Sequence, residues 1–79
     1  MTPKQRELLL FIKDYTEMRK YAPSLKDMAD YFGKYRSTMF NRVSILIEKG
    51  WLGHDAYIER SYYITDKGMS ELRKLGLIN

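Results

Sequence analysis

Two short amphipathic segments separated by one glycine constrain the fold of this chain more than any other feature. Residues 25–32 place apolar side chains at i, i+3, i+4 and i+7, and residues 39–47 at i, i+4, i+7 and i+8. Both spacings are those of helices with one buried face. Gly33 can take the left-handed conformation that ends a helix, and Gly50 stops the second segment. We therefore expect helices at about 25–32 and 36–49, joined by a tight turn: a helix-turn-helix. The predicted inner positions are Leu25, Met28, Ala29 and Phe32, then Met39, Val43, Leu46 and Ile47.

A further helix precedes this pair. Thr2 and Pro3 form a helix-start signal, because threonine caps free N–H groups and proline fits the first turn. The pattern predicts a helix over about 3–19, and Pro23 keeps it from running on. Its apolar stripe is Leu8, Phe11, Ile12 and Tyr15. Leu10 lies opposite that stripe, either as a lone exposed leucine or as part of a dimer contact.

A hairpin and a last helix follow the pair. Residues 51–64 are rich in β-forming side chains and predict two strands, with Trp51 opening the first, 61–64 forming the second and the turn around 56–60. Two strands alone are marginally stable, so the hairpin must pack on the helices. Its expected anchors are Trp51, Leu52 and Ile64. Thr65 can cap a helix over about 66–75. The apolar edge of that helix is Met69, Leu72 and Leu75. The expected fold is mainly α with a small β-hairpin: a winged helix-turn-helix in one domain over 1–79.

Charge is distributed unevenly along the chain. The net charge of +4 comes from 14 basic and 10 acidic residues, yet no acidic residue lies between positions 31 and 47. Lys34, Arg36 and Arg42 fall inside that stretch, which favours a polyanionic partner. In a helix-turn-helix the second helix presents its first turns to the DNA major groove. The candidate DNA-binding residues are Lys26, Lys34, Arg36, Ser37, Thr38, Asn41, Arg42 and Arg60.

These candidates have different expected roles. Arginine can pair with guanine and asparagine with adenine, so the first turns of the helix, with Arg36 and Asn41, are expected to read bases. Arg42 would reach a base or a phosphate, and the two lysines suit phosphates, which position the protein. Arg60 and Tyr57 would reach the minor groove or the backbone from the hairpin.

Every one of these roles has a plainer alternative. Each side chain could be an ordinary solvated group, and Arg60 could instead pair with Asp55 or Glu59. Phe40 could flank the core or touch a thymine methyl group. His54 is expected at the surface.

Other features exclude several classes of protein. The chain has no cysteine and one histidine, so we expect no disulfide, metal site or cofactor. No apolar run approaches a membrane span, and the start lacks the pattern of a signal peptide, so the expected location is the cytoplasm without a membrane contact. No acid–base pair, nucleophile–histidine set or phosphate loop is present, so we do not expect an enzyme.

The run TPKQRELLLFIKDYTEMRKYAPSLKDMADYFG resembles the opening of the LexA repressor's DNA-binding domain. The shared features are a Thr-Pro-x-Gln start, an aliphatic helix, an x-x-Pro-Ser connection and an Asp-hydrophobic-Ala step before the turn. The run STMFNRVSILIEKGWL is similar to the wider MarR-like winged-helix pattern, and YYITDKG resembles the strand-to-helix junction after the wing. One departure is Tyr35, where family members commonly have a small polar residue. LexA repressors also carry a C-terminal self-cleaving, dimerising domain, and we expect none of that chemistry in this chain.

The combined prediction is sequence-specific binding of double-stranded DNA by a small transcriptional regulator or repressor of bacterial or phage type. Two alternatives stay open. One is a winged helix that binds proteins without DNA. The other is an architectural, replication or excision protein of a mobile element. A single winged helix covers one half-site, so a homodimer through the first and last helices is expected.

Overall fold

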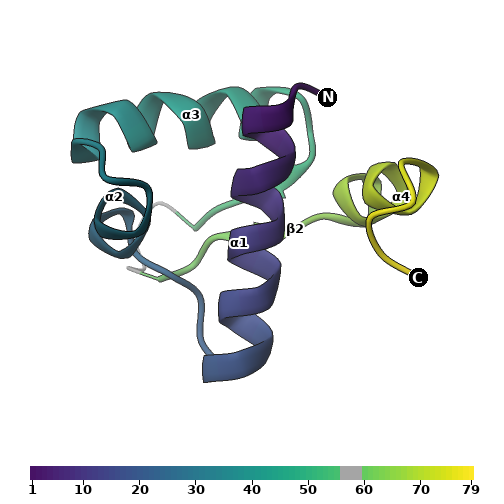
Figure 1. The fold of residues 1–79 in the computed structure, drawn as a ribbon, viewed down its shortest axis with the longest axis horizontal. Coiled ribbons are helices and arrows are strands. Elements are labelled where there is room, and N and C mark those ends of the chain that lie inside the picture. Colours follow the sequence, from purple (N-terminus) through teal and green to yellow (C-terminus); the bar gives the residue numbers. More distant parts are fainter. Residues whose placement is uncertain (56–59) are drawn as a thin grey trace.

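The computed structural model describes residues 1–55 and 60–79, and within them four helices are arranged around a short hairpin (Figure 1). The elements are α1 (Pro3–Arg19), α2 (Leu25–Phe32), α3 (Arg36–Glu48), β1 (Leu52–Gly53), β2 (Tyr63–Ile64) and α4 (Asp66–Lys74). The predicted bounds of α1 and α2 are confirmed, while α3 and α4 each end one residue earlier than predicted. In Figure 1, α3 runs across the top, α1 descends from it, α2 lies to the left and α4 to the right.

Reciprocal side-chain caps fix the starts of α1 and α2. The Thr2 hydroxyl accepts a hydrogen bond from the Gln5 backbone N–H at 3.2 Å, and the Gln5 side chain accepts one from the Thr2 N–H at 2.8 Å. Ser24 and Asp27 form the same exchange at the start of α2, at 3.1 and 2.9 Å. Each pair satisfies two backbone donors that a helix leaves without internal partners. Gly33 ends α2 in the left-handed conformation, with φ of 64°.

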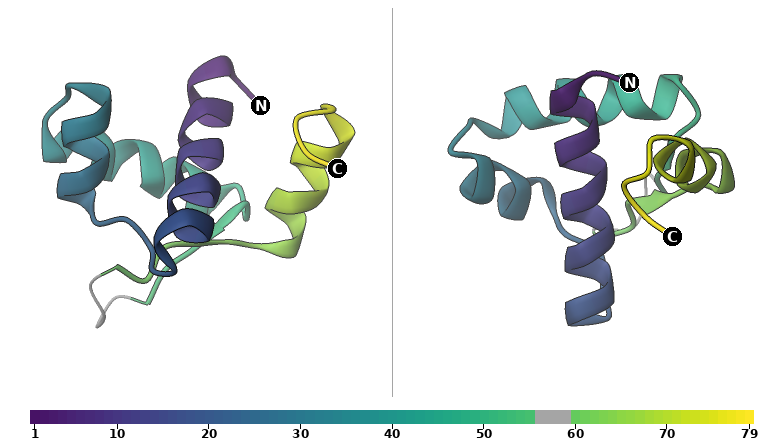
Figure 2. Two further views of the ribbon diagram at one scale, coloured as in Figure 1. Left: turned by 60° about the horizontal axis from the view of Figure 1, so that its bottom comes forward. Right: turned by 45° about the vertical axis from the view of Figure 1, so that its right-hand side comes forward.

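The core lies where the four helices and the hairpin meet. Its most deeply buried side chains are Leu8, Leu9, Ile12, Met28, Met39, Val43, Leu46, Leu52 and Leu72. Leu9 was not predicted to be buried. It is covered because α1 also packs against β2. α1 is therefore enclosed on a second side, in addition to the side that carries Leu8 and Ile12. The two further views in Figure 2 show α1 between the α2–α3 pair and α4.

Several predicted inner positions are less buried than expected. Ile47 is 38% exposed, and Leu75 is 42% exposed. Ile47 is eight residues after Met39, so it is turned by about 80° around the helix axis relative to Met39. It therefore lies at the edge of the buried stripe rather than within it. Leu75 caps the end of α4 instead of lying inside it. Placing Ile47 and Leu75 on the buried faces was therefore wrong. Leu25, Phe32, Phe11 and Tyr15 are half-buried.

The hairpin is shorter than predicted. β1 and β2 pair antiparallel with Leu52 opposite Ile64 and Gly53 opposite Tyr63. Trp51 lies outside β1, so the prediction that it opens the strand was wrong, and residues 61–62 likewise precede β2. The Tyr63 ring lies over Gly53, where any side chain would overlap it. The predicted turn falls mostly on residues 56–59, which lie outside the described residues, as does Tyr57.

The hairpin is held to the core by the side chains that flank its strands. Leu52 is fully buried, while Trp51 and Ile64 are half-buried against the core cluster. Tyr62 is also buried, and its ring stacks on the exposed His54 with 4.1 Å between centroids. His54 therefore lies at the surface, as predicted. The three expected anchors all contact the core, which attaches the short hairpin to the helices.

The end of α3 is tied to the start of α4 by three hydrogen bonds. The Thr65 hydroxyl donates to the Gly50 carbonyl at 2.6 Å, and the Thr65 N–H donates to the Trp51 carbonyl at 3.1 Å. The Lys67 ammonium donates to the Lys49 carbonyl at 2.9 Å, which places a cation at the negative end of α3. The same Thr65 hydroxyl accepts from the backbone N–H three residues later and caps α4 as predicted.

Gly68 has a packing reason to be a glycine in the first turn of α4. A Cβ atom at this position would overlap the Trp51 carbonyl oxygen and press on the Ile64 side chain. We expect Gly68→Ala to lower the free energy of unfolding by about 1–3 kcal/mol. Helix propensity alone would give the opposite sign, because alanine in a helix is favoured over glycine by about 1 kcal/mol.

Urea denaturation followed by circular dichroism measures this change. Lys74→Ala, at an exposed position in the same helix, is the matched control and should change stability by less than about 0.5 kcal/mol. A Gly68→Ala protein as stable as the unmodified chain would contradict the close approach of α4 to Trp51.

Candidate nucleic-acid interface

The outer face of α3 carries the residues predicted to read bases. Arg36, Ser37 and Asn41 are exposed, and Thr38 and Arg42 are half-buried. Ser37 and Asn41 lie about opposite the buried stripe around the helix axis, since successive residues turn by about 100°. Arg36 and Arg42 lie at the two flanks of this outward side, and the exposed Ile45 lies on it beside Asn41. Phe40, at 55% exposed, borders this side and is not a buried core residue.

The start of α3 differs from the starts of the other described helices. Side chains cap α1, α2 and α4, whereas Tyr35 at the N-cap of α3 makes no side-chain cap hydrogen bond. Tyr35 is 83% exposed, so its ring does not cover the helix end. The first-turn N–H groups of α3 consequently lack a side-chain acceptor. A helix start of this kind favours an anionic partner, because its N–H groups and dipole present partial positive charge.

A small hollow between α1 and α3 lies beside Arg42. It has a volume of about 180 Å³ and is lined partly by Lys4 from α1 and Arg42 from α3. The sequence did not single out Lys4, because helical periodicity does not reveal which residues of α1 lie beside α3. Lys26 and Lys34 are exposed at the start of α2 and in the turn, and Lys26 forms an ion pair with Asp30 at 2.9 Å.

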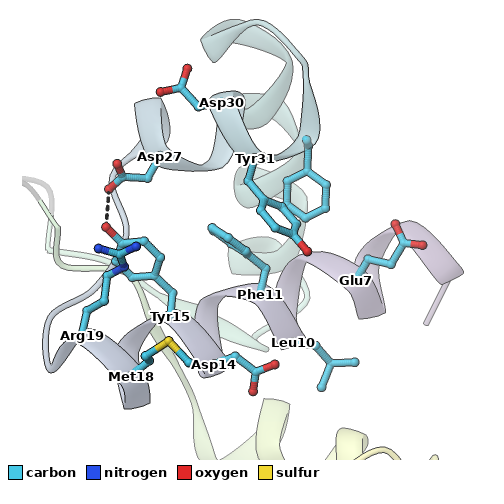
Figure 3. Close-up of a pocket in the computed structure, with 11 residues that line it drawn as sticks. Glu7, Leu10, Phe11, Asp14, Tyr15, Met18, Arg19, Asp27, Asp30 and Tyr31 are labelled. Carbon is cyan, nitrogen blue, oxygen red and sulfur yellow. Dashed lines mark hydrogen bonds between the residues drawn. The ribbon is translucent and has the colours of Figure 1, made fainter.

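A groove between α1 and α2 has the opposite charge (Figure 3). Its volume is about 970 Å³, and its floor includes the rings of Phe11 and Tyr31, with 4.4 Å between their centroids. Arg19 contributes a cation to the lining. Its acidic side chains are Glu7, Asp14, Asp27 and Asp30. Such a surface repels a phosphate backbone. The charge distribution therefore favours α3, and not the α1–α2 groove, as the face for a polyanion.

The Arg60 side chain folds back onto the helices. Its Nη1 donates to the Asp27 carboxylate at 2.6 Å, to the Tyr15 hydroxyl at 3.3 Å and to the Ala22 carbonyl at 3.5 Å. The Tyr15 hydroxyl donates to the same Asp27 oxygen at 3.0 Å. The guanidinium carbon also lies 5.0 Å from the centroid of the Tyr21 ring, a cation–π distance.

This network was not predicted, although the residue types were visible. Asp27 is 33 positions from Arg60, and no local pattern pairs residues at that separation. The predicted contact of Arg60 with DNA stays a prediction, but the described structure gives its guanidinium a partner within the protein.

Hydrogen bonding lowers the pKa of Asp27 to about 2. The backbone N–H of Ser24 is the largest cause, partial burial works against it, and the side chains of Ser24, Tyr15 and Arg60 add to the lowering. Burial raises the pKa of Tyr15, so its hydroxyl remains a donor toward the carboxylate. The Asp27 carboxylate is thus ionised over the physiological range and caps α2 while it holds Arg60.

No other type of site is found in the part of the chain that the structure describes. Groups of three or more His, Asp or Glu side chains able to hold a metal ion are absent from residues 1–55 and 60–79. A search of the same residues finds no helix long and apolar enough to cross a membrane.

The fold and the surface together define the class of protein. α2 ends at Gly33 and packs on α3 across a short turn. α3 carries two arginines on its outer side, and an antiparallel hairpin follows α3 directly. This is a winged helix-turn-helix domain. A family model described as the LexA DNA binding domain matches residues 1–61, and the chain belongs to that family.

Similar full-length proteins are LexA repressors. The chain is 35% identical over 80 residues to the one from Pelotomaculum thermopropionicum, covering 100% of this chain and 38% of that protein. It is 33% identical over 72 residues to the one from Finegoldia magna, covering 90% of this chain and 35% of the relative. It is 31% identical over 65 residues to the Oleidesulfovibrio alaskensis protein, with 82% and 31% covered. The chain thus spans about a third of the length of these relatives. The family resemblance predicted from the sequence is confirmed, while the MarR-like features stay a prediction.

The pKa of Asp27 makes stability depend on acid. The folded value of about 2 lies below the ordinary 3.8, so ionised Asp27 stabilises the fold above about pH 4, and this contribution is lost as the pH falls toward 2. We expect the term to be worth about 2 kcal/mol, since one pKa unit corresponds to about 1.4 kcal/mol. Asp27→Asn should therefore be less stable at neutral pH and lose less stability on acidification.

Urea denaturation at a series of pH values measures this difference. Asp14→Asn removes an exposed carboxylate from α1 and should keep the acid profile of the unmodified protein. An Asp27→Asn protein that loses as much stability as the unmodified chain between about pH 4 and 2 would argue against the lowered pKa of Asp27.

Proposed function

We propose that this domain binds double-stranded DNA in a sequence-specific manner through α3 and acts as a transcriptional repressor of bacterial or phage type. The observation that carries the proposal is the surface of α3: its outward side carries polar side chains flanked by two arginines, its start has no side-chain cap, and its one acidic residue is Glu48 at the end. Membership of the LexA DNA-binding family supports it, as do relatives that are named repressors. This function would place the protein in the cytoplasm, and it requires no chemical step from this chain.

In this proposal the residues of α3 divide into base readers and phosphate contacts. Arg36 can donate two hydrogen bonds to guanine, and Asn41 can pair with both groups on the major-groove edge of adenine. Ser37 and Thr38 lie beside them and would donate to bases or phosphates. The cations around α3 would position this helix on the phosphate backbone of the DNA. These cations are Lys26, Lys34 and Arg42, joined by Lys4 at the edge of the small hollow.

Selection from a pool of randomised duplexes tests the proposed function. We expect the protein to enrich one consensus and Arg36→Ala and Asn41→Ala each to weaken binding to it by about 1–3 kcal/mol, roughly 5- to 150-fold. The reason is that each substitution removes a pair of hydrogen bonds that would go to one base. Lys74→Ala removes an equal charge from exposed α4 and should weaken binding by less than about threefold.

The other outcomes separate the alternatives. Absence of binding even at low salt would refute the proposal and favour a winged helix that binds proteins. Binding without any consensus would favour an architectural, replication or excision role. Equal weakening by the Lys74→Ala control would show that net charge, and not the face of α3, governs the affinity.

We also propose that the domain acts as a homodimer through α1 and α4, because two half-sites are usually needed for specific binding. Exposed apolar side chains directly after α4 support this choice: Leu75 is 42% and Leu77 39% exposed. Leu10 on α1 is half-buried and packs against the core, which leaves part of its surface for a contact.

Sedimentation equilibrium at high protein concentration measures the mass. We expect association toward twice the single-chain 9.4 kDa, with Leu77→Asp shifting the equilibrium toward the monomer because it places a charge in the contact. A mass equal to one chain at the highest concentration, both for the free protein and with a duplex that carries two half-sites, would refute this contact.

A further inference from the structure

We infer that Arg60 is a positioning residue, which joins the hairpin to α1 and α2 through Asp27 and so fixes the hairpin relative to α3 for DNA binding. This inference rests on the proposed DNA-binding function. It also replaces the predicted role of Arg60 as a DNA contact. We call the set of Arg60, Asp27 and Tyr15 the clasp.

The geometry of the clasp joins three separate parts of the chain. Arg60 begins the second arm of the hairpin, Asp27 lies in the first turn of α2, and Tyr15 lies in α1. One guanidinium nitrogen of Arg60 donates to both the carboxylate and the hydroxyl, at 2.6 and 3.3 Å, and the hydroxyl donates to the carboxylate at 3.0 Å. Every polar atom in this triangle has a partner. A charged hydrogen bond of this kind is stronger than a neutral one and has a defined direction.

The clasp is more sheltered than an ordinary surface ion pair. The Asp27 side chain is 25% exposed and that of Arg60 40% exposed, whereas the side chains of the Lys26–Asp30 pair are 64% and 66% exposed. The face of the Tyr21 ring covers part of the guanidinium. Partial burial and a ring contact reduce screening by solvent, so this pair can hold a segment in place where an open surface pair would not.

The backbone conformation of Arg60 supports the inference that this residue has a positioning role. Its φ of 59° lies in the left-handed region, which disfavours residues with a side chain other than glycine. Such a conformation persists where surrounding contacts hold it. The side-chain contacts of the clasp start from this residue, three positions before the short strand β2.

Among the residues that the structure describes, the hairpin has few other attachments on this side. Its strands are two residues each, and a pair of this length is not stable without packing. Tyr62 and Ile64 anchor β2 at the core end, and the clasp adds an attachment at the outer end of the same arm. Loss of the clasp would therefore leave the core intact and release the outer part of the hairpin.

A double-mutant cycle on DNA affinity tests the inference. The variants are Asp27→Asn, Arg60→Asn and the two together, because asparagine tolerates a positive φ better than most residues. Affinity is measured by fluorescence anisotropy on the duplex that the unmodified protein selects, at several salt concentrations. We expect each single substitution to weaken binding about tenfold and the pair to weaken it no further, because each one breaks the same contact.

Two features of this result distinguish a positioning role from a DNA contact. If only the net charge mattered, removal of an acidic side chain would tighten binding to DNA. Weaker binding by Asp27→Asn would therefore point to the clasp. A phosphate contact by Arg60 would lower the salt slope by about one when Arg60 is removed, whereas the clasp leaves the slope unchanged. Asp14→Asn, which removes an exposed acid of α1 outside the clasp, should bind at least as tightly as the unmodified protein.

Loss of stability must also be separated from loss of position. Ile12→Val removes one methylene from the core and destabilises the fold without touching the clasp, and it should leave the affinity unchanged at temperatures where the protein is folded. If Arg60→Asn fails to fold, Tyr15→Phe removes only the hydroxyl and should weaken binding about threefold.

Amide hydrogen exchange in the free protein gives a readout independent of DNA. We expect exchange at the amides of β1 and β2 to be about tenfold faster in Asp27→Asn and Arg60→Asn, with the α1 core amides unchanged. Unmodified affinity for Asp27→Asn, or a salt slope lowered by about one in Arg60→Asn, would overturn the inference. Failure of the unmodified protein to bind any duplex would instead refute the proposed function, and the exchange rates would still decide whether the clasp holds the hairpin.

Discussion

Burial of one face of α3 is the constraint on which the rest of the structure depends. Met39, Val43 and Leu46 are almost completely buried, and α2 packs on the same helix. A helix held by one stripe has a fixed rotation about its axis, so the opposite side is fixed as well. That opposite side carries Ser37 and Asn41. The hydrophobic core therefore sets the orientation of the surface that we propose to meet DNA, although none of the core residues takes part in binding.

Charge is divided between the two sides of the domain in a way that serves both stability and the proposed function. Of the acidic side chains of α1 and α2, Asp27 caps α2 and lines the groove of Figure 3 together with Glu7, Asp14 and Asp30, and Glu17 pairs with Lys13. α3 has one acidic residue, Glu48 at its last position, and the helix begins without a side-chain cap. A capping carboxylate at that position would stabilise the helix and also repel phosphate. The missing cap costs some stability and leaves the helix start available to an anion.

The segments that follow α3 depend on close backbone approaches rather than on a large core. Thr65 and Lys67 satisfy carbonyl groups at the end of α3, and Gly68 lets α4 come against the Trp51 carbonyl. At the other end of the hairpin, one cation reaches back to α2 and α1. A hairpin of two-residue strands is thus attached at both ends by specific polar contacts.

The sequence by itself determined the elements whose causes are local. Capping residues Thr2, Ser24 and Thr65, the terminating Gly33 and the apolar periodicity of α2 and α3 gave the helices and their order, because each signal acts within a few residues. The same periodicity placed the α3 candidates on the outer face. Only the tertiary structure decided the burial of Leu9, the position of Lys4 beside Arg42, the fit of Gly68 against Trp51 and the pairing of Arg60 with Asp27. Those contacts join residues that are distant along the chain, and no pattern within one segment records which distant segment it will meet.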